Sequence, residues 1–163
     1  MTGRLLANLP SIDGKPCGSP HDRRVVFLRS LAVLTGSTIQ LARLPDGTVP
    51  DVLQRSPSGL SLFLGEAKDT EHPGRLDTQH RLLGYLSWLR SGLVGGTRTG
   101  TAAVCYGSRA HTPEWTRVLT MLARDAGLWE VEGGRSHFET GLNLVWLRWE
   151  PQLHHEGIPD TSL

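Results

Sequence analysis

Two carboxylates and a lysine lie close together in one apolar stretch, "GTVPDVLQRSPSGLSLFLGEAKD", residues 47–69. Asp51 falls in a short expected strand, and Glu66 and Lys68 fall at the end of a longer one. Charged groups are costly to bury unless they are paired or bind a metal. Two clustered carboxylates without a metal would repel each other, and the pKa of one would rise. The residue types therefore raise the question of a metal site at this strand end.

The period of a strand places these side chains relative to one another. Side chains alternate between the two faces of a strand, so Glu66 and Lys68 point the same way, about 7 Å apart. Asp51 is on the preceding strand, and the intervening turn "SPSG" can bring the two strand ends together. We therefore expect two carboxylates and one ammonium group to converge at one end of a sheet.

This combination suits phosphodiester hydrolysis. Hard carboxylate oxygens bind Mg²⁺, which lowers the pKa of a bound water and stabilises charge on phosphate oxygens. A nearby lysine can orient that water and offset developing negative charge. The plainer alternative is an exposed strand end, where Glu66 and Lys68 form an ion pair worth about 0–1 kcal/mol.

The elements that position these residues follow from periodicity and turn residues. We expect an α/β fold in which a mixed sheet is flanked by helices. Three consecutive strands form an antiparallel meander, and a later strand enters through a helical crossover, so that part of the sheet is parallel. One domain, 21–150, is expected between an irregular arm, 1–20, and a flexible tail, 151–163. The expected elements are a helix at 21–34, strands at 37–45, 49–54 and 60–68, a helix at 75–90, a strand at 101–108, a helix between Thr112 and Gly127, and a hairpin at 128–151.

The motif resembles a known family. Pro50-Asp51, then fourteen residues, then Glu66-Ala67-Lys68 is similar to the signature of the PD-(D/E)xK nuclease superfamily. The expected order of helix, three strands, helix and strand resembles its restriction-endonuclease-like core, over residues 21–110. The resemblance implies that Asp51, Glu66 and the carbonyl of Ala67 bind Mg²⁺ or Mn²⁺. It also implies that Lys68 activates the attacking water.

Two further positions bear on the resemblance. Many members carry a glutamine early in the helix after the lysine strand, and Gln79 would support the site in that way. The submotif Q-x-x-x-Y is not met, because Tyr85 follows Gln79 by six residues, although Arg81 and Tyr85 are spaced i, i+4. Members also often place a glutamate on the first helix. This chain offers only Asp22 there, which is expected to cap the helix or face solvent.

Basic residues provide candidate nucleic-acid contacts. Arg23 and Arg24 on the first helix and Arg98 in the loop after the second could bind phosphates. The alternatives are a solvated helix face for the first two and a flexible connector for Arg98. The apolar strand "LNLVWLRW" leaves a homodimer open as an alternative.

Composition narrows the classes of protein. A chain of 163 residues with 20% charged and 38% hydrophobic residues predicts a soluble globular domain. Cys17 and Cys105 form no CxxC pair, which argues against a zinc finger or a disulfide framework. No apolar run approaches the roughly 18 residues that span a bilayer. We find no signal-peptide or P-loop pattern, and we expect a cytoplasmic protein without a membrane partner or nucleotide cofactor.

Three functions remain open from the sequence. The leading hypothesis is a metal-dependent deoxyribonuclease, an endonuclease rather than an exonuclease. The absent glutamate on the first helix motivates the second, a catalytically inactive nuclease fold that binds DNA or serves in an assembly. The third is an α/β interaction module in which Asp51, Glu66 and Lys68 are ordinary surface charges.

Overall fold

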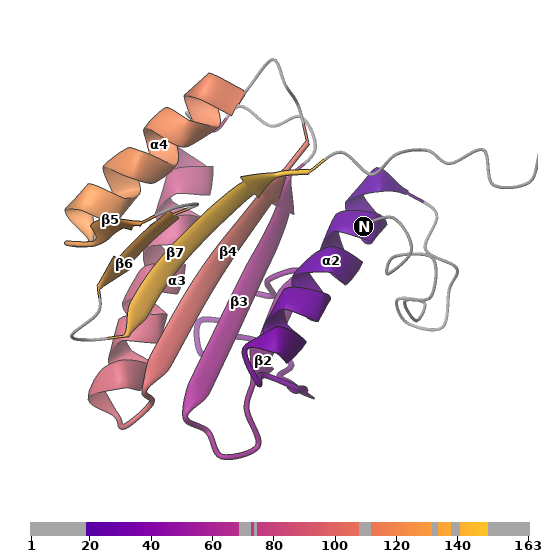
Figure 1. Cartoon of the computed structure of the whole chain (residues 1–163), viewed down its shortest axis with the longest axis vertical. Coiled ribbons are helices and arrows are strands. Elements are labelled where there is room, and N and C mark those ends of the chain that lie inside the picture. The colour runs from indigo at the N-terminus through magenta and orange to yellow at the C-terminus, as the bar shows by residue number, and fades with distance from the viewer. Residues whose placement is uncertain are drawn as a thin grey trace, which may run out of the picture.

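A mixed β-sheet with helices on both faces forms the body of the protein (Figure 1). The computed structural model describes residues 19–68, 73, 75–107, 112–131, 134–137 and 141–149. The expected arm and tail lie outside these residues, apart from Ser19 and Pro20. In chain order the described elements are α2 (Pro20–Leu34), β1 (Ile39–Gln40), β2 (Val52–Arg55), β3 (Ser61–Lys68), α3 (Leu76–Val94), β4 (Thr99–Tyr106), α4 (Thr112–Asp125), β5 (Trp129–Val131), β6 (Gly134–His137) and β7 (Leu142–Arg148).

The strand order of the sheet is β1-β2-β3-β4-β7-β6-β5. Its three central strands, β3, β4 and β7, run parallel, and the strands outside them pair antiparallel. Parallel neighbours need a long crossover, and α3 makes the one from β3 to β4. The expected α/β class, the mixed sheet and the antiparallel meander of the first three strands are confirmed.

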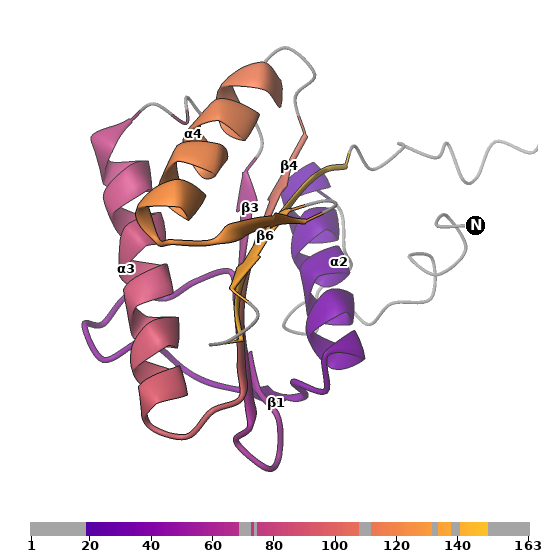
Figure 2. The same cartoon turned by 60° about the vertical axis from the view of Figure 1, so that its left-hand side comes forward.

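The helices divide into two layers. Figure 2 shows α2 on one face of the sheet and α3 and α4 on the other. On the α2 side, Leu28 packs with Phe63 and Cys105 in one buried cluster. On the other side, a larger cluster includes Tyr85 and Trp115. Because both faces are covered, the central strands are apolar on both sides.

Local sequence fixes where α2 begins. Ser19 is the N-cap, its hydroxyl accepts from the Asp22 N–H at 3.0 Å, and the Asp22 carboxylate accepts from the Ser19 N–H at 3.4 Å. This reciprocal capping box, with Pro20 in the first turn, stabilises the helix start. Asp22 is thus part of the cap, as expected, although Ser19 is the N-cap residue itself. The cap places the first turn of α2 beside the end of β3.

A glycine lets α2 lie close to the sheet. A Cβ atom at Gly65 would lie 3.2 Å from the Cβ of Val52 and 3.3 Å from that of Leu28. Any larger residue would crowd both neighbours, since such contacts are tighter than normal packing. Gly65 directly precedes Glu66, so the close approach of α2 occurs next to the charged residues.

Several expected boundaries differ in the structure, including those of β4, which is Thr99–Tyr106 rather than 101–108. The first strand is only Ile39–Gln40, and the second begins at Val52, so Asp51 lies just before a strand. The second helix continues past Arg90 to Val94. The expected C-terminal hairpin is present as the antiparallel pair β6–β7, with β5 as a third strand beside β6, and β7 also pairs parallel with β4. An apolar strand such as β7 gains most from an interior position in the sheet.

None of the helices within the described ranges combines the length and apolar character that crossing a membrane requires.

Candidate active site at the carboxyl end of β3

Asp51 is held in place by the backbone of β3. The β2–β3 register pairs Val52 with Gly65, and one further step places Asp51 opposite Glu66. The N–H of Ala67 donates to Oδ2 of Asp51 at 2.8 Å, so a side chain continues the ladder beyond the end of β2. Pro50, which has no N–H to donate, stands where the strand pairing stops. The Pro-Asp pair thus ends a strand and fixes a carboxylate.

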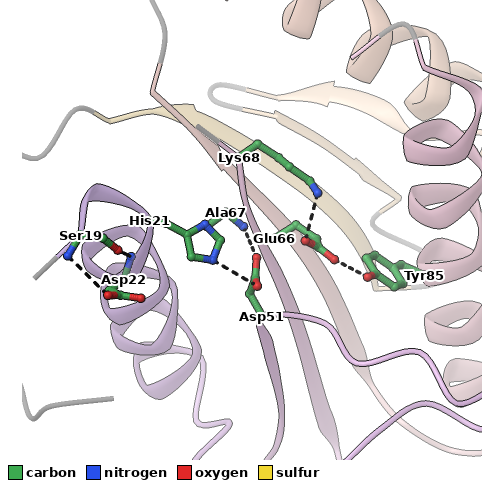
Figure 3. Close-up of polar contacts among 8 residues, drawn as sticks. All are labelled: Ser19, His21, Asp22, Asp51, Glu66, Ala67, Lys68 and Tyr85. Atoms are coloured by element: carbon green, nitrogen blue, oxygen red, sulfur yellow. Dashed lines mark hydrogen bonds and ion pairs between the residues drawn. The ribbon is translucent and has the colours of Figure 1, made fainter. Parts of the chain in front are cut away.

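Glu66 lies inside the protein on the α3 side of the sheet. It is 3% exposed. The Tyr85 hydroxyl, from α3, donates a hydrogen bond to its Oε1, and the Lys68 Nζ lies 3.7 Å from its Oε2 (Figure 3). Glu66 and Lys68 therefore share a face, as strand alternation predicts. Both oxygens of the carboxylate have a polar neighbour, as a buried carboxylate requires.

Burial and a neighbouring charge make Glu66 hard to ionise. Burial, and after it the negative charge of Asp51, raises the pKa of Glu66 to about 7. The Tyr85 hydrogen bond and the Lys68 charge act in the opposite direction. Asp51 and Glu66 are thus close enough to repel each other when both are ionised. A cation placed between them would remove that repulsion.

Tyr85 was not predicted from the sequence as a site residue. Its side chain is buried on the inner face of α3 with Leu82, Leu86 and Leu89. Burial and the charge of Glu66 raise the pKa of Tyr85 above its usual value, so that it stays a neutral hydrogen-bond donor. The available signal was a phenol within a leucine stripe, because a buried hydroxyl needs a partner.

His21 was also missed. Its Nε2 lies 3.5 Å from Oδ1 of Asp51, an ion pair when the imidazole is protonated, and its side chain is 41% exposed. Figure 3 shows His21 directed at Asp51, whereas Asp22 is directed at Ser19. The first helix therefore contributes a histidine, rather than an acid, to the surroundings of Asp51.

Gln79 lies in the first turns of α3, and its role in catalysis stays a prediction. Its side chain is half-buried, and its amide nitrogen donates to the carbonyl of Pro73 at 3.4 Å. This contact ties the start of α3 to the preceding segment. Apart from the Ala67 N–H, the described contacts of the carboxylates come instead from His21, Lys68 and Tyr85.

The arginines expected to bind nucleic acid lie in three different settings. Arg24 is 5% exposed, and its Nε donates to the carbonyl of Trp149 at 3.0 Å, so it packs inside the protein rather than facing a ligand. Arg98 is exposed but directly precedes β4, at the opposite end of the sheet. Six strand residues put it about 20 Å from the level of Glu66. Arg23 is half-buried on α2, and its contact with nucleic acid stays a prediction.

The residues at this strand end fit a hard divalent cation. They offer two carboxylates and the backbone carbonyl of Ala67, and oxygen ligands are those that Mg²⁺ prefers. Burial raises the pKa of Glu66 most, and the charge of Asp51 adds to that rise. A cation bound to both carboxylates would offset the repulsion between them. Within the described part of the chain no three His, Cys, Asp or Glu residues form a closed ligand cluster. A cation held here would keep several waters, as Mg²⁺ commonly does.

Comparison with known proteins identifies no relative: no family model, no curated protein and no solved structure matches this chain. Functional inference therefore depends on the geometry of the site itself.

Replacing Tyr85 with phenylalanine should move the pH dependence of any Glu66-linked activity to higher pH. The substitution removes the hydroxyl that lowers the pKa of Glu66, so this pKa will rise and the carboxyl will ionise at a higher pH. It also leaves Oε1 without its donor, which should cost about 1–3 kcal/mol of stability. The measurement is a pH–rate profile of metal-dependent cleavage.

Tyr106→Phe provides a matched control for this variant. Tyr106 is the other tyrosine of the chain, equally buried, and its ring stacks on Trp115. Removing the Tyr106 hydroxyl should leave the pH–rate profile unshifted. An unshifted profile in the Tyr85 variant would show that the phenol does not act on Glu66.

Proposed function

We propose that this chain is a metal-dependent nuclease of the PD-(D/E)xK type, which hydrolyses DNA phosphodiester bonds. The observation that carries the proposal is the convergence of Asp51, Glu66 and Lys68, with Asp51 bonded to the residue between the other two. Strands β2 and β3 and helices α2 and α3 surround this point. A restriction-endonuclease-like core is the architecture that the element order favours.

Each residue has a distinct part in the proposed reaction. Asp51 and Glu66 supply the negative charge that holds Mg²⁺ or Mn²⁺, with the Ala67 carbonyl as a further oxygen ligand. When bound, the ion would lower the pKa of a water and polarise the phosphate. Lys68 orients the attacking water and offsets charge on the phosphate oxygens. Tyr85 keeps Glu66 oriented, and His21 does the same for Asp51.

A second function is favoured by one specific observation. Both Glu66 oxygens have protein neighbours, Tyr85 and Lys68, so the carboxylate can be satisfied without a metal. A nuclease fold that binds DNA without cutting it would show this arrangement. Metal-independent DNA binding, with no cleavage of linear, supercoiled or branched substrates, would identify it.

The Lys68→Met variant tests the proposed function. It keeps the length of the apolar stem and removes the ammonium group. We expect supercoiled plasmid to be cut in Mg²⁺ by the wild-type protein, and about a hundred- to a thousandfold more slowly by the variant. Lys68→Arg is the matched control that keeps the charge but alters its geometry, and it should recover only part of the rate. Equal rates for wild type and Lys68→Met, or undiminished cleavage in EDTA, would overturn the proposal.

A further inference from the structure

A small basic pocket lies beside the carboxylates, between the end of β3 and the start of α3. Its volume is about 170 Å³, well above the roughly 10–15 Å³ that a cavity needs to hold one water. A group the size of a phosphate therefore fits. The described residues that line it are all polar, namely Lys68, Arg75, Asp77, Thr78 and Arg81.

The charge of this lining favours an anion. Among the lining residues that the structure describes, three side chains are cations and one is a carboxylate, which is an excess of positive charge. Arg75 is the N-cap of α3 and makes no side-chain capping bond, and the positive end of the helix dipole adds to the field. Asp77 accepts from the Thr78 N–H at 3.0 Å, which occupies one of its oxygens. Arginine and lysine together are well suited to phosphate oxygens.

Two residues link the pocket to the candidate active site. Lys68 lines the pocket while its ammonium lies 3.7 Å from Glu66. Arg81, which also lines the pocket, lies one helical turn before Tyr85, and its charge acts on the Tyr85 hydroxyl. A phosphate in the pocket would therefore lie adjacent to a group bound at the carboxylates.

We infer that this pocket binds a backbone phosphate of the nucleic-acid strand next to the phosphodiester that is cut. The inference rests on the proposed function for the identity of the strand. Successive phosphates along a strand are close neighbours, and the pocket and the carboxylates share Lys68 as a common wall. Arg75 and Arg81 are then strand-positioning residues, and Asp77 is the unfavourable member of the pocket.

Equilibrium binding of a fluorescent oligonucleotide in EDTA tests this inference without any cleavage. Arg75→Gln and Arg81→Gln should each weaken binding about tenfold and each lower the slope of log affinity against log salt by about one. Asp77→Asn should change the affinity in the opposite direction and tighten binding several-fold. A residue with a purely structural role would not have this effect. A 5′-phosphorylated and a 5′-hydroxyl strand should bind equally well if the phosphate is internal.

Arg124→Gln is the matched control, because it removes the same charge from an exposed site in the last turn of α4, away from the pocket lining. It should leave affinity and salt slope unchanged. Unchanged binding in both pocket variants, or an equal loss in the Arg124 variant, would overturn the inference. A dependence on the 5′-phosphate would overturn the internal position and assign a strand end instead. These binding measurements do not depend on cleavage in Mg²⁺. The phosphate-binding inference can therefore be refuted while the proposed nuclease activity is retained, or the nuclease activity refuted while phosphate binding is retained.

Discussion

Replacing Asp51 with asparagine should lower the rate of Mg²⁺-dependent DNA cleavage by on the order of a thousandfold. The amide oxygen of asparagine can still accept the hydrogen bond from the Ala67 N–H, so the end of β2 keeps its geometry. What the variant loses is one of the two negative charges that hold the cation. The loss should therefore fall on metal affinity and on rate, with the fold retained.

Asp46→Asn is the control for this experiment. Asp46 lies in the exposed turn before β2, where its carboxylate accepts from the Thr48 N–H at 2.8 Å. An asparagine can make the same turn contact, and the overall change in charge is identical. Cleavage by this variant should match that of the wild type. If Asp51→Asn were as active as the wild type at every Mg²⁺ concentration, including limiting ones, Asp51 would not be a metal ligand.

Replacing Glu66 with glutamine should stabilise the metal-free protein at pH 8 and abolish cleavage. In the unfolded chain Glu66 ionises near its ordinary pKa of 4.5, whereas burial and Asp51 raise the folded-state pKa to about 7. Between these values the folded state holds more protons, so the free energy of unfolding falls as the pH rises. The total penalty above pH 7 is about 3 kcal/mol, which the neutral amide does not incur.

Urea unfolding of both proteins at pH 4.5 and pH 8, in EDTA, measures this effect. Wild type and variant should be most alike at pH 4.5, where Glu66 is protonated in the folded state. The variant should be the more stable at pH 8 by up to about 3 kcal/mol. Mg²⁺ should stabilise the wild type at pH 8 and leave the variant almost unaffected, since binding to the folded state alone raises stability. If the variant were less stable than the wild type at pH 8, the ionised Glu66 carboxylate would not destabilise the folded protein.

Opposite effects on stability and activity, as expected here for Glu66→Gln, are characteristic of functional sites. A carboxylate that is costly in the folded protein persists when its charge is needed for binding or catalysis. The pH dependence of stability therefore bears on function without assaying it.

Strand alternation correctly predicted the relative positions of Glu66 and Lys68. The eight-residue β3 was expected almost to its boundaries, and its period alone places Glu66 and Lys68 on one face. The turn after the second strand was sufficient to bring Asp51 opposite Glu66. These features are local, because each depends on residues fewer than twenty positions apart.

The neighbours contributed by the helices could not be predicted in the same way. His21 reaches Asp51 and Tyr85 reaches Glu66 only because of how α2 and α3 dock on opposite faces of the sheet. A hydrophobic stripe predicts which face of a helix is buried, but not which strand residue each side chain meets. The position of Arg24 was predicted wrongly, since a cation on this helix was expected to face outward, whereas it is buried. It instead binds the carbonyl of Trp149, 125 residues away in the sequence.

The most direct test of a shared cation at Asp51 and Glu66 is anomalous scattering from crystals soaked in Mn²⁺. We predict one strong peak between the two carboxylates, within about 2–2.5 Å of an oxygen of each. The same soak of Asp51→Asn crystals should show the peak lost or greatly weakened. Wild-type crystals in which no neighbouring molecule covers the site, yet which show no manganese between the two carboxylates at saturating Mn²⁺, would contradict the metal site.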